Sequence, residues 1–588
     1  MYQDLLQQYT SQLAILSGRL NRIVWMRLII AIITIVCLYF SIQLDLSWLL
    51  LLALAGMVAF FFLVRQYQKL TRIATITTAL VKVNEDEMTY LSGAAIPYDH
   101  GSELMPPIHA YAYDLDFFGP NSLFQHLNRT STQLGKVQLG QHLLSLLPQE
   151  QIPDQQAAIQ ELAPKLNWRQ SLQALAATKK DNQQTVDQLH RWVAQPSPDL
   201  PIWSIILMWL LPIILIGAIV VYCFQPEQFL LSISSAIFSL NLLVFGLFFK
   251  RIQQEIADFD RVHEYLRQYG LLAENIENEV FISKKTVDLT AKLKNTDGMA
   301  SVQITRLSEL FGRLDTMANM MVVLLFDGLF LYHVHTLKSL LDWKKKYATR
   351  IPGWLEVIGT MESWSSLANF AHNNPSFAYP EMNTDYKVHF EELGHPLIRS
   401  EKRICNTVRF TEQKFIVLTG SNMSGKSTFL RSLGINMVLT GIGAPVCATR
   451  AVVHPLPVIV SMRLSDSLSD SESYFFAEVK RLKEIMDFLG QKRAFVLLDE
   501  ILRGTNSDDK RMGTVGVLKK MVAKQAIGAI ATHDIEVCNT TDEYPKDLMN
   551  KCFEVEMVGN ELHFDYRLRD GICQNKSASF LMGKMGII

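Results

Sequence analysis

Residues 414–428 read K-F-I-V-L-T-G-S-N-M-S-G-K-S-T, and this stretch decides the fold of the C-terminal part of the chain. It contains the pattern G-x-x-x-x-G-K-[ST], with an apolar run before it that predicts a strand and a helical stretch after it. Glycines let such a loop curl so that successive backbone N–H groups face phosphate oxygens at the positive end of the helix. We therefore predict an ATP-binding loop made of Gly420, Ser421, Asn422, Met423, Ser424, Gly425, Lys426, Ser427 and Thr428.

A second run, A-F-V-L-L-D-E at 494–500, predicts a buried strand that ends in two acids. Ligands of open α/β sheets bind at the carboxyl ends of the strands, so these acids should face the loop. We expect Ser427 and Asp499 to bind Mg²⁺ and Lys426 to stabilise the β- and γ-phosphates. Glu500 would act as the base that polarises the attacking water. The alternatives are a structural glycine turn and a solvated acidic turn.

A third strand-like run, A-I-G-A-I-A-T-H-D at 526–534, ends in a histidine. His533 could sense the γ-phosphate as a catalytic switch, and the alternative is an ordinary surface histidine. Three such runs in this order predict an ATP hydrolase whose cofactors are ATP and Mg²⁺.

Four other stretches, 23–42, 46–64, 202–224 and 229–249, are apolar and long enough to cross about 30 Å of hydrocarbon. They form two hairpins because only short spacers separate the members of each pair. Lys and Arg flank the hairpins away from the spacers, which predicts that both termini and residues 65–201 lie in the cytoplasm. No Asp, Glu, Lys or His lies in the middle of a block, which favours an anchor over an ion path. The alternative is a set of buried core helices in a soluble protein.

Composition limits the class of protein. Among 588 residues, 56 are Lys or Arg and 57 are Asp or Glu, which excludes a strongly basic nucleic-acid protein but not a local basic groove. The seven cysteines form no C-x-x-C pair, so the pattern indicates neither a zinc ribbon nor a disulfide scaffold.

The fold class that we predict is multi-domain, with four transmembrane α-helices, an all-α core and lever region, and a C-terminal α/β P-loop domain of the ABC-like kind. Helical periodicity predicts the core, and periodic runs such as 304–340 indicate a helical bundle or a long helical arm. The expected parts are an N-terminal cytoplasmic segment (1–22), hairpin 1 (23–64), a cytoplasmic helical region (65–201), hairpin 2 (202–249), the arm (250–377) and the ATPase domain (378–588).

These motifs resemble the MutS family of mismatch-repair ATPases. The run 419–432 is similar to the phosphate loop of that family, including its Asn-Met pair, and 498–509 is similar to its acid strand and the loop after it. The A-T-H-D run matches its histidine switch, and 466–479 its signature segment. The resemblance implies a homodimer through the ATPase domains, in which Ser473 completes the ATP site of the other subunit. Ser471 and Glu472 depart from the family, which usually has Gly and often Arg there.

The resemblance extends over about 115–195 and 255–588, through segments such as 113–135 and 393–398. Mismatch-reading members carry an N-terminal domain with a Phe-x-Glu reader, whereas a membrane hairpin is expected here. Phe-x-Glu strings begin at Phe390, Phe410 and Phe476, and we interpret each as accidental. We expect the C-terminal helix-turn-helix of the family to be largely absent.

DNA contact would require a basic groove. The candidate residues are Lys292, Lys294, Lys338, Lys344, Lys345, Lys346 and Arg350. A solvated helix face and contact with anionic lipid are the alternatives. Two functions stay open: a multi-pass ATPase of the cytoplasmic membrane that clamps duplex or branched DNA in DNA repair, and a membrane ATPase that acts on a protein or lipid partner without DNA.

Overall fold

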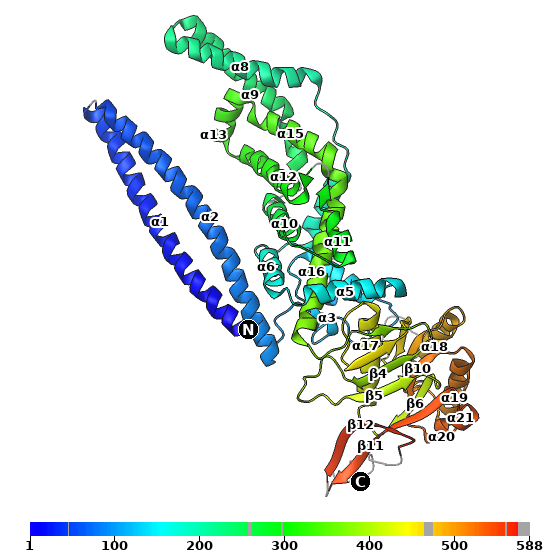
Figure 1. The fold of residues 1–588 in the computed structure, drawn as a ribbon. Helices are drawn as coiled ribbons and strands as arrows, with labels where there is room; N and C mark the ends of the chain where they lie inside the picture. The colour runs from blue at the N-terminus through cyan, green and yellow to red at the C-terminus, as the bar shows by residue number, and fades with distance from the viewer. Residues whose placement is uncertain (45, 257–261, 296–297, 464–473, 559–560, 574–588) are drawn as a thin grey trace.

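The computed structural model describes residues 1–44, 46–256, 262–295, 298–463, 474–558 and 561–573. These residues form two long helical hairpins, a helical core with an arm, and a C-terminal part built on two β-sheets (Figure 1). The tips of both hairpins point away from the sheets.

Four helices contain the apolar blocks, and by length and composition each could cross a membrane. They are α1 (Tyr2–Leu44), α2 (Ser47–Ser92), α8 (Ile202–Phe224) and α9 (Gln228–Ile256). Most side chains of the blocks are exposed rather than packed in a core, as expected of helices that face lipid. Helices α1 and α2 also extend beyond their blocks toward the helical core. Gly93, at φ 71°, ends α2 in the left-handed conformation that glycine adopts without steric penalty.

The helical core surrounds α16 (Ile351–Asn373), which is buried along most of its length. The helices packed around it in the first part of the chain are α3 (Leu123–Leu127), α4 (Gln133–Leu144), α5 (Ile152–Leu162) and α6 (Leu166–Ala177), while α7 (Gln183–Ala194) packs against α4. The arm contains α10 (Val262–Glu277), α11 (Lys284–Ala291), α12 (Ala300–Asp315) and α15 (Tyr332–Tyr347), with the short strands β1 (Lys294–Asn295) and β2 (Gly298–Met299). Short 3-10 turns are η1 (Ser102–Leu104), η2 (Gln149–Gln151), η3 (Thr316–Ala318) and η5 (Ala348–Arg350).

The periodic run 304–340 is divided among several helices. Helix α12 ends at Asp315 and α15 starts at Tyr332. Between them lie α13 (Met320–Val322), the π-turn η4 (Val323–Asp327) and α14 (Gly328–Phe330). The break has a local cause, because Leu331 adopts φ 50° and the Asp327 carboxylate accepts a hydrogen bond from the His333 amide at 2.8 Å. Periodicity did not reveal the break because the segment stays apolar throughout.

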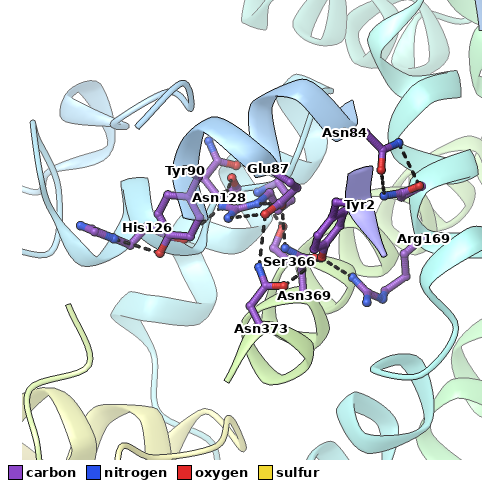
Figure 2. A network of polar contacts seen from close by, with 12 residues as sticks. Tyr2, Asn84, Glu87, Tyr90, His126, Asn128, Arg169, Ser366, Asn369 and Asn373 are labelled. Atoms are coloured by element: carbon purple, nitrogen blue, oxygen red, sulfur yellow. Dashed lines mark hydrogen bonds and ion pairs between the residues drawn. The ribbon is translucent and has the colours of Figure 1, made fainter. Parts of the chain in front are cut away.

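A buried polar cluster joins the base of the α1–α2 hairpin to α16 (Figure 2). Glu87 of α2 forms an ion pair with Arg129, and both side chains are buried. Asn369 and Asn373 of α16 donate to the Glu87 carboxylate at 2.8 and 3.2 Å, and the Tyr2 hydroxyl donates to Asn373 at 2.8 Å. Burial alone would raise the pKa of Glu87, but Arg129 and these hydrogen bonds hold it below its usual value. The hairpin is thus attached to the helix that leads directly into the C-terminal part.

The C-terminal part contains a six-stranded sheet in the order β12-β11-β6-β10-β9-β8, in which β12 alone is antiparallel. Its strands are β6 (Phe415–Gly420), β8 (Val458–Ser461), β9 (Phe495–Asp499), β10 (Ile527–Ala531), β11 (Leu548–Val558) and β12 (Glu561–Asp570). A four-stranded sheet of order β3-β7-β4-β5 lies next to it, with β3 (Glu381–Met382), β4 (Val388–Leu393), β5 (Asn406–Phe410) and β7 (Arg450–Val453). The helices are α17 (Lys426–Gly441), α18 (Tyr474–Leu489), α19 (Ser507–Ala523), α20 (Ile535–Cys538) and α21 (Thr540–Glu543). Strands β6, β9 and β10 are adjacent and buried, so the three predicted site segments emerge at one edge.

Candidate nucleotide-hydrolysing site

The phosphate loop connects β6 to α17. Gly425 precedes the first residue of α17 and has φ 101°, a conformation that side chains with a Cβ rarely adopt. A Cβ at this position would also lie 3.0 Å from a ring carbon of Tyr566. Met423 has φ 67°, so the loop turns through a second left-handed residue. The backbone therefore needs glycine where the loop enters the helix, as the motif predicts.

Lys426 is buried at the start of α17, and its ammonium lies against the loop. It donates to the carbonyl oxygens of Gly420 and Ser421 at 2.9 and 3.0 Å and lies 3.3 Å from Nε2 of His533. Burial lowers the pKa of Lys426, while the nearby carboxylates of Glu500 and Asp499 oppose that shift. The structure thus brings the predicted phosphate-binding cation together with the groups of β9 and β10.

Ser427 and Asp499 contact each other, and together they suit a hard cation. The Ser427 hydroxyl donates to Oδ2 of Asp499 at 2.6 Å. The other oxygen, Oδ1, is buried and has no hydrogen-bond partner among the described residues. A buried carboxylate oxygen beside a hydroxyl is the kind of ligand that Mg²⁺ prefers, so these residues fit the ion. Bound there with ATP, Mg²⁺ would neutralise charge on the phosphates.

Glu500 directly follows β9 and forms an ion pair with His533. Its Oε1 lies 2.6 Å from Nε2 of His533, and Arg503 lies 3.6 Å from its other oxygen. The hydrogen bond with His533 lowers the pKa of Glu500 to about 2, against the opposite effect of partial burial. Glu500 is therefore ionised at neutral pH, the form that a general base needs.

Glu478 of α18 stabilises the loop after Glu500 through hydrogen bonds. The buried carboxylate of Glu478 accepts hydrogen bonds from the amides of Leu502 and Arg503 at 2.6 and 3.0 Å. Leu502 has φ 61°, so these bonds stabilise an unusual backbone conformation directly beside the base. Sequence analysis placed Glu478 in the signature segment without giving it this role.

A cavity of about 460 Å³ opens in front of the loop. Residues 421–428 and Glu500 line one side of it. The rest of the lining comes from residues that sequence analysis did not assign to the site: Leu393, His395, Ile398, Lys402, Ile404, Asn406, Phe429, Ser432, Phe553 and Tyr566. The segment 393–398 was noted for its family resemblance alone. No sequence pattern pointed to Tyr566, whose ring stacks with that of Phe564 two residues earlier on β12. This mixture of aromatic, aliphatic and amide groups suits a nucleobase.

Ser473 lies outside the described residues, together with most of the signature segment that precedes α18. Its contribution to the ATP site of a second subunit stays a prediction. The Phe-x-Glu residues Phe390 and Phe410 are fully buried in β4 and β5, so neither could reach DNA.

Most of the predicted basic residues of the arm contact acidic or aromatic side chains of the protein. Lys344 is buried, with its ammonium 3.6 Å from Glu255 and over the ring of Trp192. Lys292 pairs with Glu356 at 3.1 Å, and Lys345 with Asp199 at 2.9 Å. Other members also have partners, since Lys338 pairs with Asp342 while Lys346 and Arg350 approach the ring of Tyr347.

The C-terminal part is similar to known proteins. The family model described as MutS domain V matches residues 416–585. The chain is 33% identical over 224 residues to the DNA mismatch repair protein MutS of Thermotoga neapolitana, a match that covers 37% of this chain and 26% of that protein. It is 26% identical over 304 residues to MutS protein homolog 4 of Homo sapiens, which covers 49% of this chain and 30% of that protein. The chain thus spans less than a third of the length of these relatives. The C-terminal domain, with its phosphate loop, acid strand and histidine after β10, is thus a domain of the MutS family's domain V kind.

Proposed function

We propose that this chain is a Mg²⁺-dependent ATP hydrolase anchored in the cytoplasmic membrane by four spans, with both termini and the ATPase domain in the cytoplasm. One observation carries the catalytic part: the Glu500 carboxylate lies 2.6 Å from Nε2 of His533, next to Lys426 and the Ser427–Asp499 pair. These are the positions from which a base, a phosphate-binding cation and a metal site can act on one phosphate chain. The apolar helices α1, α2, α8 and α9 support the membrane part.

Similarity to the named relatives favours duplex or branched DNA as the partner on which the ATPase acts. The MutS of Thermotoga neapolitana is named for DNA mismatch repair, and we extend DNA binding to this chain as part of the proposal. Two protomers would clamp DNA with two ATP molecules between their ATPase domains, each site completed by Ser473 of the other copy. Mismatch reading itself is not part of the proposal.

The second candidate for the partner on which the ATPase acts is a protein or lipid at the membrane. The observation that favours it is the pairing of Lys292, Lys344 and Lys345 with acidic residues, which leaves less positive charge for phosphate backbones. Helices α12 and α15 of the arm also contact α9, so motion of the arm would be transmitted to the bilayer.

Steady-state ATP hydrolysis by the detergent-solubilised full chain tests both proposals. Glu500→Gln should bind ATP but hydrolyse it at least about 100-fold more slowly, because the base is lost. Glu484→Gln on α18 is the matched control, since this exposed glutamate pairs only with Arg481 among the contacts described. Unchanged turnover in Glu500→Gln would contradict the assignment of the site.

The same assay with homoduplex, mismatched and branched DNA at two salt concentrations identifies the partner. Stimulation that weakens as salt rises supports a DNA clamp, because phosphate contacts release counterions. Turnover that is insensitive to every DNA at low salt would exclude DNA and favour the protein or lipid partner at the membrane.

A further inference from the structure

The segment between α12 and α15 has an unusual surface. Between Thr316 and Leu337, Asp327 is the only acidic, Lys or Arg residue in the sequence. Six large apolar side chains of this stretch are exposed: Met320, Met321, Leu324, Leu325, Phe326 and Phe330. In a protein surrounded by water, such a continuous patch would be costly, at about 25 cal/mol for each Å² left exposed.

Contacts with α9 place this segment along the apolar block 229–249. The backbone carbonyl of Gly328 accepts a hydrogen bond from the side-chain amide of Asn241, Nδ2, at 2.8 Å. A Cβ on Gly328 would lie 2.3 Å from the ring of Phe238, so only glycine fits against α9 here. Phe238 and Asn241 lie near the middle of the block, and Asn241 is about 12 Å along the helix from its cytoplasmic end. Gly328 is therefore at mid-depth if α9 spans the membrane.

Both limbs of the segment lie nearer the cytoplasmic end of the same block. The ring of His333 is 5.8 Å from that of Phe245, one turn after Asn241. Thr316, on the incoming limb, lies at the same level, with its hydroxyl 3.1 Å from Nε2 of His333. His335, on the outgoing limb, contacts the carbonyl of Met208 on α8 at 2.9 Å. The chain thus approaches and leaves from one side, with a bend of 82° between the helices on either side of Leu331.

The two ionisable side chains of the turn contact each other inside the protein. Asp327 and His333 are fully buried, Nδ1 of His333 contacts Oδ2 of Asp327, and Oδ1 of Asp327 accepts a hydrogen bond from the backbone amide of His333 at 2.8 Å. An acid inside hydrocarbon needs such a partner, and irregular backbone there must be covered by protein. The Asp327–His333 pair and Asn241 meet both requirements at the one place where the helix is broken.

We infer that residues 320–330 form a re-entrant membrane element. It enters the bilayer from the side of the ATPase domain, turns beside the middle of α9, and returns to the same side through α15. Its six exposed apolar side chains contact lipid acyl chains, because they flank Gly328, which lies at the level of Leu240 and Leu243, themselves exposed on α9. This inference rests on the proposed placement of α8 and α9 across the membrane.

Spin-label accessibility in lipid vesicles tests the inference with the full chain. Cys37, Cys223 and Cys405 are the cysteines that are not buried, and they are replaced by Ser to give a background whose ATP turnover is checked. A nitroxide is then attached to Leu325→Cys, and collision rates with oxygen and with a water-soluble nickel chelate are measured in phosphatidylcholine–phosphatidylglycerol vesicles. Leu243→Cys on α9 is the lipid control, and Ile282→Cys, exposed between α10 and α11, is the water control.

The expected result at position 325 is an oxygen-to-nickel ratio equal to that at 243 and higher than that at 282. A ratio equal to that at 282 would overturn the inference, and so would protection from both reagents, which would indicate a covering protein surface. Met321→Cys repeats the measurement if Leu325→Cys loses ATP turnover. A water-like ratio at 243 would instead contradict the placement of α9, so failure of the anchor and failure of the re-entrant element give different results.

Discussion

The Ser427 hydroxyl donates to one oxygen of the Asp499 carboxylate at 2.6 Å, which leaves the other oxygen buried without a hydrogen-bond partner among the described residues. The two residues are 72 positions apart and come from the phosphate loop and the acid strand. This contact brings the phosphate loop and the acid strand together at one position, where a hydroxyl and a carboxylate suit a metal ion.

Asp499→Asn should therefore abolish most Mg²⁺-dependent turnover while keeping the shape of the side chain. The charge that would hold Mg²⁺ is lost, an effect worth several kcal/mol, or about 100-fold or more in rate. ATP binding in EDTA should change much less. Titration of turnover against Mg²⁺ measures the effect, with Asp508→Asn on the exposed start of α19 as the control. Equal turnover in both variants would contradict the metal site.

His533→Ala should change the acid limb of the pH–rate profile. His533 is the main cause that lowers the pKa of Glu500 to about 2, so its removal should let that pKa rise toward 4.5. The protonated, inactive base then accumulates at higher pH, and activity is lost earlier as pH falls. The measurement is kcat between pH 4 and 8, with the exposed His190→Ala as control. The wild type should show no acid limb from Glu500 in this range, because its pKa is about 2, so a His533→Ala profile that also lacks an acid limb would show that His533 does not set the ionisation of Glu500.

Glu87→Gln should weaken the attachment of the α1–α2 hairpin. It leaves the buried charge of Arg129 without its carboxylate, which costs about 3–5 kcal/mol when one partner of a buried pair is removed. The double variant Glu87→Gln/Arg129→Met should recover part of this loss. Thermal unfolding of the solubilised chain measures both, and Lys82→Gln, which breaks a surface pair with Asp86, should have little effect. A Glu87→Gln variant as stable as Lys82→Gln would show that the cluster contributes little.

Glu362 of α16 should make stability fall as pH rises. Burial raises the pKa of Glu362 to about 7, despite hydrogen bonds from Thr132 and from the Ser131 amide. The folded state then holds a proton that the unfolded state releases near pH 4.5, so the stabilisation is complete below that pH and is lost as pH rises through 7. The change is on the order of 3 kcal/mol. Unfolding midpoints at pH 5 and 8 should differ for the wild type and be similar for Glu362→Gln. A wild type without this difference would contradict the raised pKa.

Tyr566→Ala should raise the Kd for ATP without a large change in kcat. Tyr566 lines the cavity beside Gly425 but makes no described contact with Glu500 or Asp499, so the expected loss is of nucleotide binding rather than chemistry. A fluorescent ATP analogue measures the Kd. The control is Tyr113→Ala, an exposed tyrosine away from the cavity. A fall in kcat at unchanged Kd would contradict this role.

The sequence by itself determined the nucleotide-binding half and the apolar helices. A phosphate loop needs glycine at Gly425 and a lysine at the first turn of the helix, and a buried strand must end in its acids, so local spacing was sufficient. The four long apolar helices could also be predicted from the sequence, because a membrane span requires about 20 uninterrupted apolar residues.

Only the tertiary structure decided the remaining features. His533 lowers the pKa of Glu500, and Tyr566 completes the cavity, because strands distant in sequence become neighbours in one sheet. The break at Leu331 was invisible in an apolar run, since it depends on contacts of Asp327 with His333 and of Gly328 with Asn241. Periodicity reports which face of a helix is apolar, whereas a break in the helix and the depth of a turn are set by partners that the chain meets only after folding.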